Sequence, residues 1–376
     1  MRYNKNEPEA ENGVRIEIVG FSKRSVRSFL NYRISSCYRE VFIMIKALAK
    51  LFFNKRFNTK VSEERTAFVF AFRRGAPAGK MMIGINEELS ADRDKKIGYF
   101  AMFQCENNSL VASSMFREAA EWMKARNAAK MFGPDSITYD DFSKGVLLGR
   151  NHEKAFFLNP MNPAYFDSLL LESGLSKHRD HYAYFSTVQT ILQIKALERI
   201  HTNTVTIKSP DFSDKALIDD MYSILSHEIP DALDLLTNPS KEDIQGVVNY
   251  LSMITASRYV KIAYADTVPV GILFAIPNYN EVLRYNSTWV SGVLSLLFKK
   301  RIRSARIIFA YIIPEYQRKM VSLQLIKALL LEMSHNKCER IEISTVDERN
   351  SLCVRSLEKV IPAPTRVYRE YVMDIA

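Results

Sequence analysis

The segment 307–326 (IIFAYIIPEYQRKMVSLQLI) combines residue types that suit the binding of an anion. Residues 307–313 predict a buried strand, and residues 321–336 place apolar side chains on one face of a helix. A turn from a strand into a helix leaves backbone N–H groups without partners at the helix N-terminus, where the helix dipole also favours negative charge. Gln317, Arg318 and Lys319 lie in that turn. The pattern predicts a pyrophosphate site, with an ordinary strand–turn–helix carrying a solvated basic turn as the alternative.

The elements around this turn repeat in order along the chain. Apolar spacing predicts strands at 14–19, 66–73, 80–86, 95–104, 129–132 and 181–186 in the first half, and at 205–208, 259–265, 269–276, 306–313, 340–346 and 365–372 in the second. It predicts a helix that opens at Ser22, further helices at 38–53, 109–126, 163–174, 214–226, 241–254, 321–336 and 350–360, and a connecting helix at 188–201. Both halves read strand, helices, three strands, helix, strand, helix, strand. This repeat predicts two α/β modules, at 1–201 and 202–376.

Composition sets limits on the function. A chain of 376 residues suits two domains, and its net charge of +10 indicates an anionic partner, such as a phosphorylated cofactor, RNA or an anionic membrane. The four cysteines are scattered without metal-ligand spacing, so we expect no metal site. We expect a cytoplasmic protein, because no signal peptide precedes the first strand and no apolar run is long enough to span a bilayer.

The turn at 317–322 resembles the acyl-CoA loop of the GNAT superfamily of acyltransferases, whose pattern is Gln/Arg-x-x-Gly-x-Gly/Ala. Gln317 matches the first position, while Met320 and Ser322 stand where the family has small residues. Glycine at such positions lets the backbone approach phosphate closely. Further stretches are similar to the tandem GNAT proteins that include bacterial ceramide synthases: 97–100 (IGYF), 133–134 (GP), 159–166 (NPMNPAYF), 271–280 (GILFAIPNYN) and 368–371 (YREY).

This resemblance implies an α/β (mixed α+β) fold of two tandem GNAT-like modules, each a mixed twisted sheet flanked by helices. It implies acetyl-CoA or a longer acyl-CoA as co-substrate and an amine as acceptor, for example a lipid-like long-chain base. The first module lacks the loop, because residues 103–108 contain no basic residue and one carboxylate, so we expect it to act as a scaffold or as one wall of an acceptor cleft between the modules. In the second module, the resemblance implies that acyl-CoA contacts Ile312, Ile313, Gln317, Arg318, Lys319, Met320, Val321, Ser322 and Asn350.

An amine must lose a proton to attack a thioester, and the departing thiolate must gain one. Glu281 and Glu342 are the candidate bases. The GNAT tyrosine that usually follows the asparagine at the start of the last helix is absent after Asn350, so the candidate acids are Tyr311, Tyr368 and Tyr371. Each of these side chains also suits a purely structural role.

Two further segments combine apolar and basic residues. Residues 38–53 have the spacing of an amphipathic helix, and residues 289–303 (WVSGVLSLLFKKRIR) join an apolar run to four cations. Both suit either core packing or the inner face of an anionic membrane. Two other functions remain open from the sequence. One is an aminoacyl-tRNA-dependent transferase of the peptidoglycan-bridge type, and the other is a non-catalytic ligand-binding or scaffold protein with two decayed modules.

Overall fold

The computed structural model describes residues 13–34, 61–86, 95–136, 144–200, 205–227, 240–282 and 301–375. The predicted helix at 38–53 and most of the segment 289–303 lie outside these ranges. The chain divides into two compact units: residues 1–154, 158–180 and 367–376 form the first, and residues 155–157 and 181–366 form the second. The sequence predicts a boundary near residue 202. In the structure the C-terminal strand belongs to the first unit, and residues 155–157 and 181–200 belong to the second.

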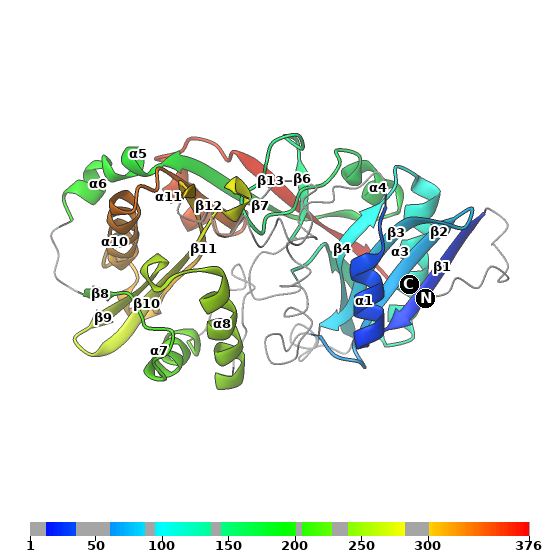
Figure 1. The fold of residues 1–376 in the computed structure, drawn as a ribbon, viewed down its shortest axis with the longest axis horizontal. Helices are drawn as coiled ribbons and strands as arrows, with labels where there is room; N and C mark the ends of the chain where they lie inside the picture. The colour runs from blue at the N-terminus through cyan, green and yellow to red at the C-terminus, as the bar shows by residue number, and fades with distance from the viewer. Residues whose placement is uncertain are drawn as a thin grey trace. The chain divides into compact units, whose positions relative to one another are not determined.

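The first unit is built on a mixed sheet (Figure 1). Strands β1 to β4 are antiparallel, β5 is parallel to β4, and β13 is antiparallel to both β5 and β6. Its strands are β1 (Val14–Gly20), β2 (Thr66–Arg73), β3 (Ala76–Asn86), β4 (Lys96–Cys105), β5 (Ala128–Gly133), β6 (Val146–Leu148), the start of β7 (Ser176–Thr187) and most of β13 (Arg366–Asp374). Its helices are α1 (Lys23–Asn31), α3 (Ser109–Lys124) and α4 (Phe166–Glu172).

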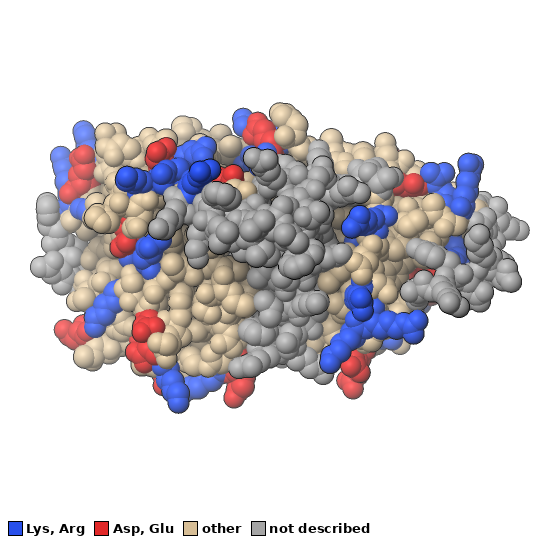
Figure 2. Space-filling model, in the orientation of Figure 1, with Lys and Arg blue, Asp and Glu red and all other residues tan. Residues whose placement is uncertain are grey.

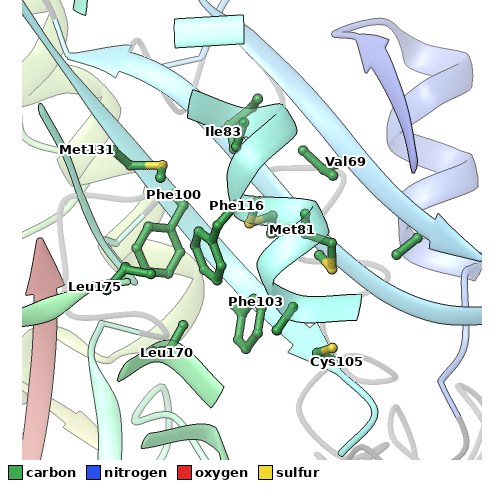
Figure 3. Close-up of a cluster of buried hydrophobic side chains, with 14 of the residues drawn as sticks. Val69, Met81, Ile83, Phe100, Phe103, Cys105, Phe116, Met131, Leu170 and Leu175 are labelled. Carbon is green, nitrogen blue, oxygen red and sulfur yellow. The ribbon is translucent and has the colours of Figure 1, made fainter. Parts of the chain in front are cut away.

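Strand β2 shows why this sheet is covered on both faces. Its sequence TAFVFAFR is apolar almost throughout, and seven of its eight residues are buried. Successive side chains of a strand point to opposite faces. Phe68 and Phe70 contact Phe29 of α1, whereas Val69 belongs to the core cluster that includes Phe116 of α3 (Figure 3). A continuous apolar strand therefore requires a helix on each side.

The second unit repeats this order. Strands β8 to β11 are antiparallel, β12 is parallel to β11, and β7 is antiparallel to β12. Its strands are β8 (Thr206–Lys208), β9 (Val260–Ala265), β10 (Val268–Pro277), β11 (Ser304–Ile312) and β12 (Arg340–Asp347), joined by the end of β7. Its helices are α5 (Val188–Leu192), α6 (Lys195–Glu198), α7 (Ala216–Leu225), α8 (Lys241–Ile254), α10 (Val321–His335) and α11 (Ser351–Glu358). The mixed α/β fold class predicted from the sequence is confirmed.

Helix α10 packs closely on one face of this sheet, and α7 and α8 lie on the other (Figure 1). Gly271 of β10 lies under α10: a Cβ atom at this position would be 3.5 Å from Leu325 Cδ1 and 3.2 Å from Ile312 Cγ1. The small residue lets α10 approach the sheet immediately beside the end of β11. None of the helices within the described ranges is long and apolar enough to cross a membrane.

The sequence predicts one continuous connecting helix at 188–201, and this prediction is wrong. The structure has two short helices, α5 and α6, separated by Gln193 and Ile194. Ile194 is extended, with ψ 123°, and this conformation interrupts the helical hydrogen bonds. Apolar spacing did not reveal the break because the alternation of apolar and polar residues continues through it.

The C-terminal strand should be essential to the first unit. Ending the chain at Arg366 removes the strand that pairs with β5 and β6, and with it Tyr368, Glu370 and Tyr371, all 0% exposed. We expect β5 amides to lose their protection from hydrogen exchange. The control is Asp374→Ala, which removes an exposed ion pair to Lys130 and should change the free energy of unfolding by less than about 1 kcal/mol. Unchanged protection of β5 in the shortened chain would contradict the assignment of β13 to this unit.

Candidate functional site

Strands β11 and β12 separate part of the way along their length. They pair from Ser304 with Arg340 to Ile307 with Ile343, yet β11 continues to Ile312 and β12 to Asp347. A bulge on β11 coincides with the separation, because Phe274 and Ala275 of β10 lie opposite Phe309 and Ile307, which leaves Ile308 as the extra residue. A bulge bends the strand that carries it. We call the separation beyond Ile307 the divergence.

Burial along β11 follows the divergence. All residues from Ser304 to Ile307 are buried, whereas Ile308 and Phe309 are half-buried and Ala310 is exposed. An exposed residue in the interior of a central strand is unusual, because both faces and both edges of such a strand are normally covered. The divergence therefore leaves an apolar stretch of backbone and side chain open to a ligand.

The turn that follows ends in an uncapped helix. A short 3-10 turn (Pro314–Tyr316) leads to Gln317, and Met320 is the N-cap residue of α10. Met320 has φ 59°, in the left-handed region, and no side chain caps the first turn of α10. The Met320 side chain is 50% exposed, and the amides of Val321 and Ser322 follow it in the first turn of α10. These amides carry the partial positive charge of the helix N-terminus.

Polar side chains of the turn add to this field. Arg318 and Lys319 are exposed, and Lys319 Nζ lies 4.4 Å from the centre of the Tyr316 ring. Gln317 Nε2 donates to the carbonyl oxygen of Ile312 at 3.1 Å, which fixes the turn to the end of β11. Elsewhere, the basic side chains visible on the face in Figure 2 form several separate groups with acidic side chains among them.

The corresponding strands of the first unit stay in contact past their last ladder pair. Strands β4 and β5 pair as far as Tyr99 with Phe132, and the Asp135 amide then donates to the carbonyl oxygen of Phe100 at 2.8 Å. Phe100 and Phe103 pack against Phe116 of α3, with ring centres 5.0 and 5.4 Å apart (Figure 3). Asn108 caps α3 by accepting from the Val111 amide at 3.2 Å. The N-cap residue of α10 in the second unit, Met320, makes no such capping bond.

Both predicted catalytic carboxylates already have strong partners. Glu281 accepts hydrogen bonds from the Arg303 amide at 2.7 Å and from Arg340 Nη2 at 2.9 Å. Glu342 is 0% exposed, accepts from Ser344 Oγ at 2.8 Å and lies 3.3 Å from Arg366 Nη1. These contacts give each carboxylate a structural role.

The predicted tyrosines fall in different units. Tyr311 is buried in β11, beyond the point where β12 departs. Tyr368 and Tyr371 belong to the first unit, where Tyr368 pairs with Leu147 and the Tyr371 hydroxyl contacts Asp167. Within the second unit, Tyr311 is therefore the predicted proton donor that lies on the diverging strands.

The last helix begins where the sequence predicts. Asn350 caps α11 by accepting from the Cys353 amide at 3.2 Å. Burial raises the pKa of the Cys353 thiol to about 11, so this thiol stays protonated at neutral pH and is unsuited to act as a nucleophile. The side chain of Asn350 is thus engaged with its own helix.

The sequence reasoning missed Arg306 and Ser344. Arg306 is 0% exposed and donates through Nε to Ser344 Oγ at 2.7 Å, next to Glu342. An arginine inside the otherwise apolar strand sequence SARIIFAYI was a visible signal, because a buried cation requires partners. The partners come from another strand, and sequence spacing did not identify them.

No model of a known protein family matches the sequence. The chain is 23% identical over 321 residues to the bacterial ceramide synthase of Caulobacter vibrioides (strain NA1000 / CB15N), with 80% of this chain and 82% of that protein covered. It is 22% identical over 296 residues to protein YghO of Escherichia coli (strain K12), with 75% of each chain covered. A solved structure, the tandem GNAT protein from the clavulanic acid biosynthesis pathway, superposes with a TM-score of 0.54 at 8% identity over 96% of this chain and 99% of that one.

The chain therefore has the tandem GNAT fold, as its motifs predicted. Within that fold it is similar to the group that contains the bacterial ceramide synthase, and these likenesses support an acyltransferase. The parting of β11 from β12 and the turn into α10 lie in the segment whose sequence resembles the acyl-CoA loop.

Met320 should carry a measurable conformational cost. A residue with a Cβ atom is disfavoured at φ 59°, whereas glycine adopts this conformation freely. We expect the free energy of unfolding of the Met320→Gly variant to be higher than that of Met320→Ala by on the order of 1 kcal/mol. This difference already allows for the greater freedom of glycine in the unfolded chain, which offsets part of the gain. Chemical denaturation of both variants measures this difference. Equal stabilities would show that the left-handed conformation at residue 320 is not strained.

Proposed function

We propose that the protein is an acyl-CoA-dependent N-acyltransferase and that its second unit binds the acyl-CoA. One observation carries this proposal: a strand that parts from its parallel neighbour leads directly into a helix whose N-terminus no side chain caps. The equivalent helix of the first unit is capped by Asn108, so the two units differ at this helix N-terminus.

The diphosphate of coenzyme A would lie against the amides of Val321 and Ser322, which face a negative charge favourably at the start of α10. Arg318 and Lys319 would contribute positive charge at the same place. The pantetheine arm carries amide groups that require hydrogen-bond partners. The backbone of β11 beyond its last pair with β12 would supply them, as far as Ile312, whose carbonyl oxygen accepts from Gln317 Nε2. Ile313 and Asn350 would frame the site.

In the reaction, the nitrogen of the amine attacks the thioester carbonyl, a C–N bond forms and the C–S bond breaks. Glu281 and Glu342 are both engaged by guanidinium groups, so we propose that water rather than either carboxylate accepts the proton of the amine. Tyr311 lies on β11 beyond the start of the divergence and is the residue that we propose as proton donor to the thiolate.

We propose a lipid-like amine as acceptor and a long-chain acyl-CoA as donor. Support comes from the name of the Caulobacter relative, a ceramide synthase, and from the apolar character of the open stretch Ile308–Ala310. A protein with such substrates would work at the inner face of an anionic membrane. Incubation with palmitoyl-CoA and a long-chain amino alcohol should release free thiol faster than incubation with palmitoyl-CoA and a short alkylamine, as a colorimetric thiol assay measures. Equal rates with the two amines would contradict the lipid acceptor.

Binding of acyl-CoA should raise the melting temperature, because a ligand that binds only the folded state stabilises it by about 2.7 kcal/mol at one hundred times its Kd. The double variant Arg318→Glu, Lys319→Glu should lose this rise, since two repulsive charges would face the diphosphate. Differential scanning fluorimetry with acetyl-CoA and palmitoyl-CoA measures both results.

The matched control reverses Lys195 and Arg199, two exposed cations of the same unit, to glutamate. It changes the net charge equally and should keep the rise. If the rise survives reversal of Arg318 and Lys319, the diphosphate binds elsewhere. If the wild-type protein shows no rise with any acyl-CoA, the proposed function is wrong.

A further inference from the structure

A fully buried arginine lies at the point where β11 and β12 part. Arg306 is paired with Glu342, and Ile307 with Ile343 is the next and last pair between the two strands. Arg306, Glu342 and Ser344 are 0%, 0% and 2% exposed. Charged groups so deeply buried are costly unless they are hydrogen-bonded and paired, so their contacts indicate what the fold gains from them.

The contacts of Arg306 cross the divergence. Its Nε donates to Ser344 Oγ at 2.7 Å, and Ser344 lies on β12 one residue beyond the last pair. Ser344 Oγ in turn donates to Glu342 Oε1 at 2.8 Å, while Arg366 Nη1 lies 3.3 Å from Glu342 Oε2. The hydroxyl of Ser344 therefore links the first residue of β12 beyond the ladder to Glu342 of the same strand and to Arg306 of β11.

The Arg306 guanidinium is itself held in place. Its Nη1 donates to the carbonyl oxygen of Phe157 at 3.2 Å. That carbonyl belongs to the segment 155–157, which the second unit binds through two asparagines: Asn278 Oδ1 accepts from the Phe157 amide at 3.0 Å, and Asn280 Nδ2 donates to the Ala155 carbonyl at 2.9 Å. A planar guanidinium with donors fixed in two directions has little freedom to follow a strand that moves.

We propose that Arg306 and Ser344 are positioning residues for acyl-CoA binding. The bridge between them holds Ser344, the first residue of β12 beyond the ladder, against β11, so the strands part after Ile307 and not before it, and the diverging strands keep the spacing that the acyl-CoA requires. The bulge at Ile308 then directs β11 away immediately beyond the bridge. This inference rests on the proposed function of the second unit, and it assigns no contact between either residue and the ligand.

Ser344→Ala tests the bridge with the loss of one oxygen atom, and Ser304→Ala is its matched control. Ser304 is 1% exposed and lies on the paired part of β11, where its hydroxyl also has a carboxylate, Glu281, and an amide, Asn278 Nδ2, as partners. Both variants should lower the melting temperature by similar amounts. Only Ser344→Ala should weaken binding of palmitoyl-CoA, by up to about tenfold, because the energy of one hydrogen bond to a charged group limits what loss of the bridge can cost.

Isothermal titration calorimetry of the full chain gives the Kd for palmitoyl-CoA, and the thiol assay gives KM and kcat. Arg306→Lys provides a second test, because lysine keeps the charge but lacks the fork that reaches Ser344 and Phe157 together. It should raise KM as Ser344→Ala does, and the double variant should raise it no further, since both remove the same bridge.

Equal Kd values for Ser344→Ala and Ser304→Ala, or additive effects in the double variant, would overturn the inference. A wild-type protein that binds no acyl-CoA would instead overturn the proposed function.

Discussion

The second unit depends on an interruption in its own sheet. Parallel strands normally satisfy each other's backbone groups along their whole length, and an unpaired edge seeks a partner. Strands β11 and β12 give up that partnership after Ile307 while each keeps its other neighbour, β10 or β7. The fold therefore tolerates open backbone at one place without losing the sheet, and the turn into α10 places an uncapped helix N-terminus at the end of the same strand.

The two units show that such an interruption has two stable outcomes. In the first unit, Phe100 and Phe103 pack against Phe116 of α3 (Figure 3), and Asn108 caps the helix. In the second unit Ile308 and Phe309 are half-buried and Ala310 is exposed, and the N-cap residue Met320 makes no side-chain capping bond. The contrast follows from a few side chains on a common scaffold, in keeping with the general rule that function lies in sites and not in folds.

The sequence predicted the strand, the turn and the helix at 307–326 because each rests on a strong local pattern: an apolar run, a proline and three-four apolar spacing. It did not predict what depends on distant partners. The ion pair of Glu342 with Arg366 and the bridge from Arg306 to Ser344 join residues on different strands. Nor did spacing show that the C-terminal strand joins the first unit or that Ile194 divides the helix at 188–201, since both are set by tertiary contacts and backbone conformation.

Met320 illustrates how a departure from a sequence pattern acts through the backbone. The residue stands where the resembling loops have glycine, and the structure gives it φ 59°, the conformation that glycine would supply. Its side chain is half exposed and makes no capping hydrogen bond to the helix. The substitution therefore affects conformational energy before it affects the chemistry of the site, because the groups that meet an anion are main-chain N–H groups that every residue but proline possesses. What would destroy such a site is a side chain that caps the helix, and Asn108 shows in the first unit how little change that takes.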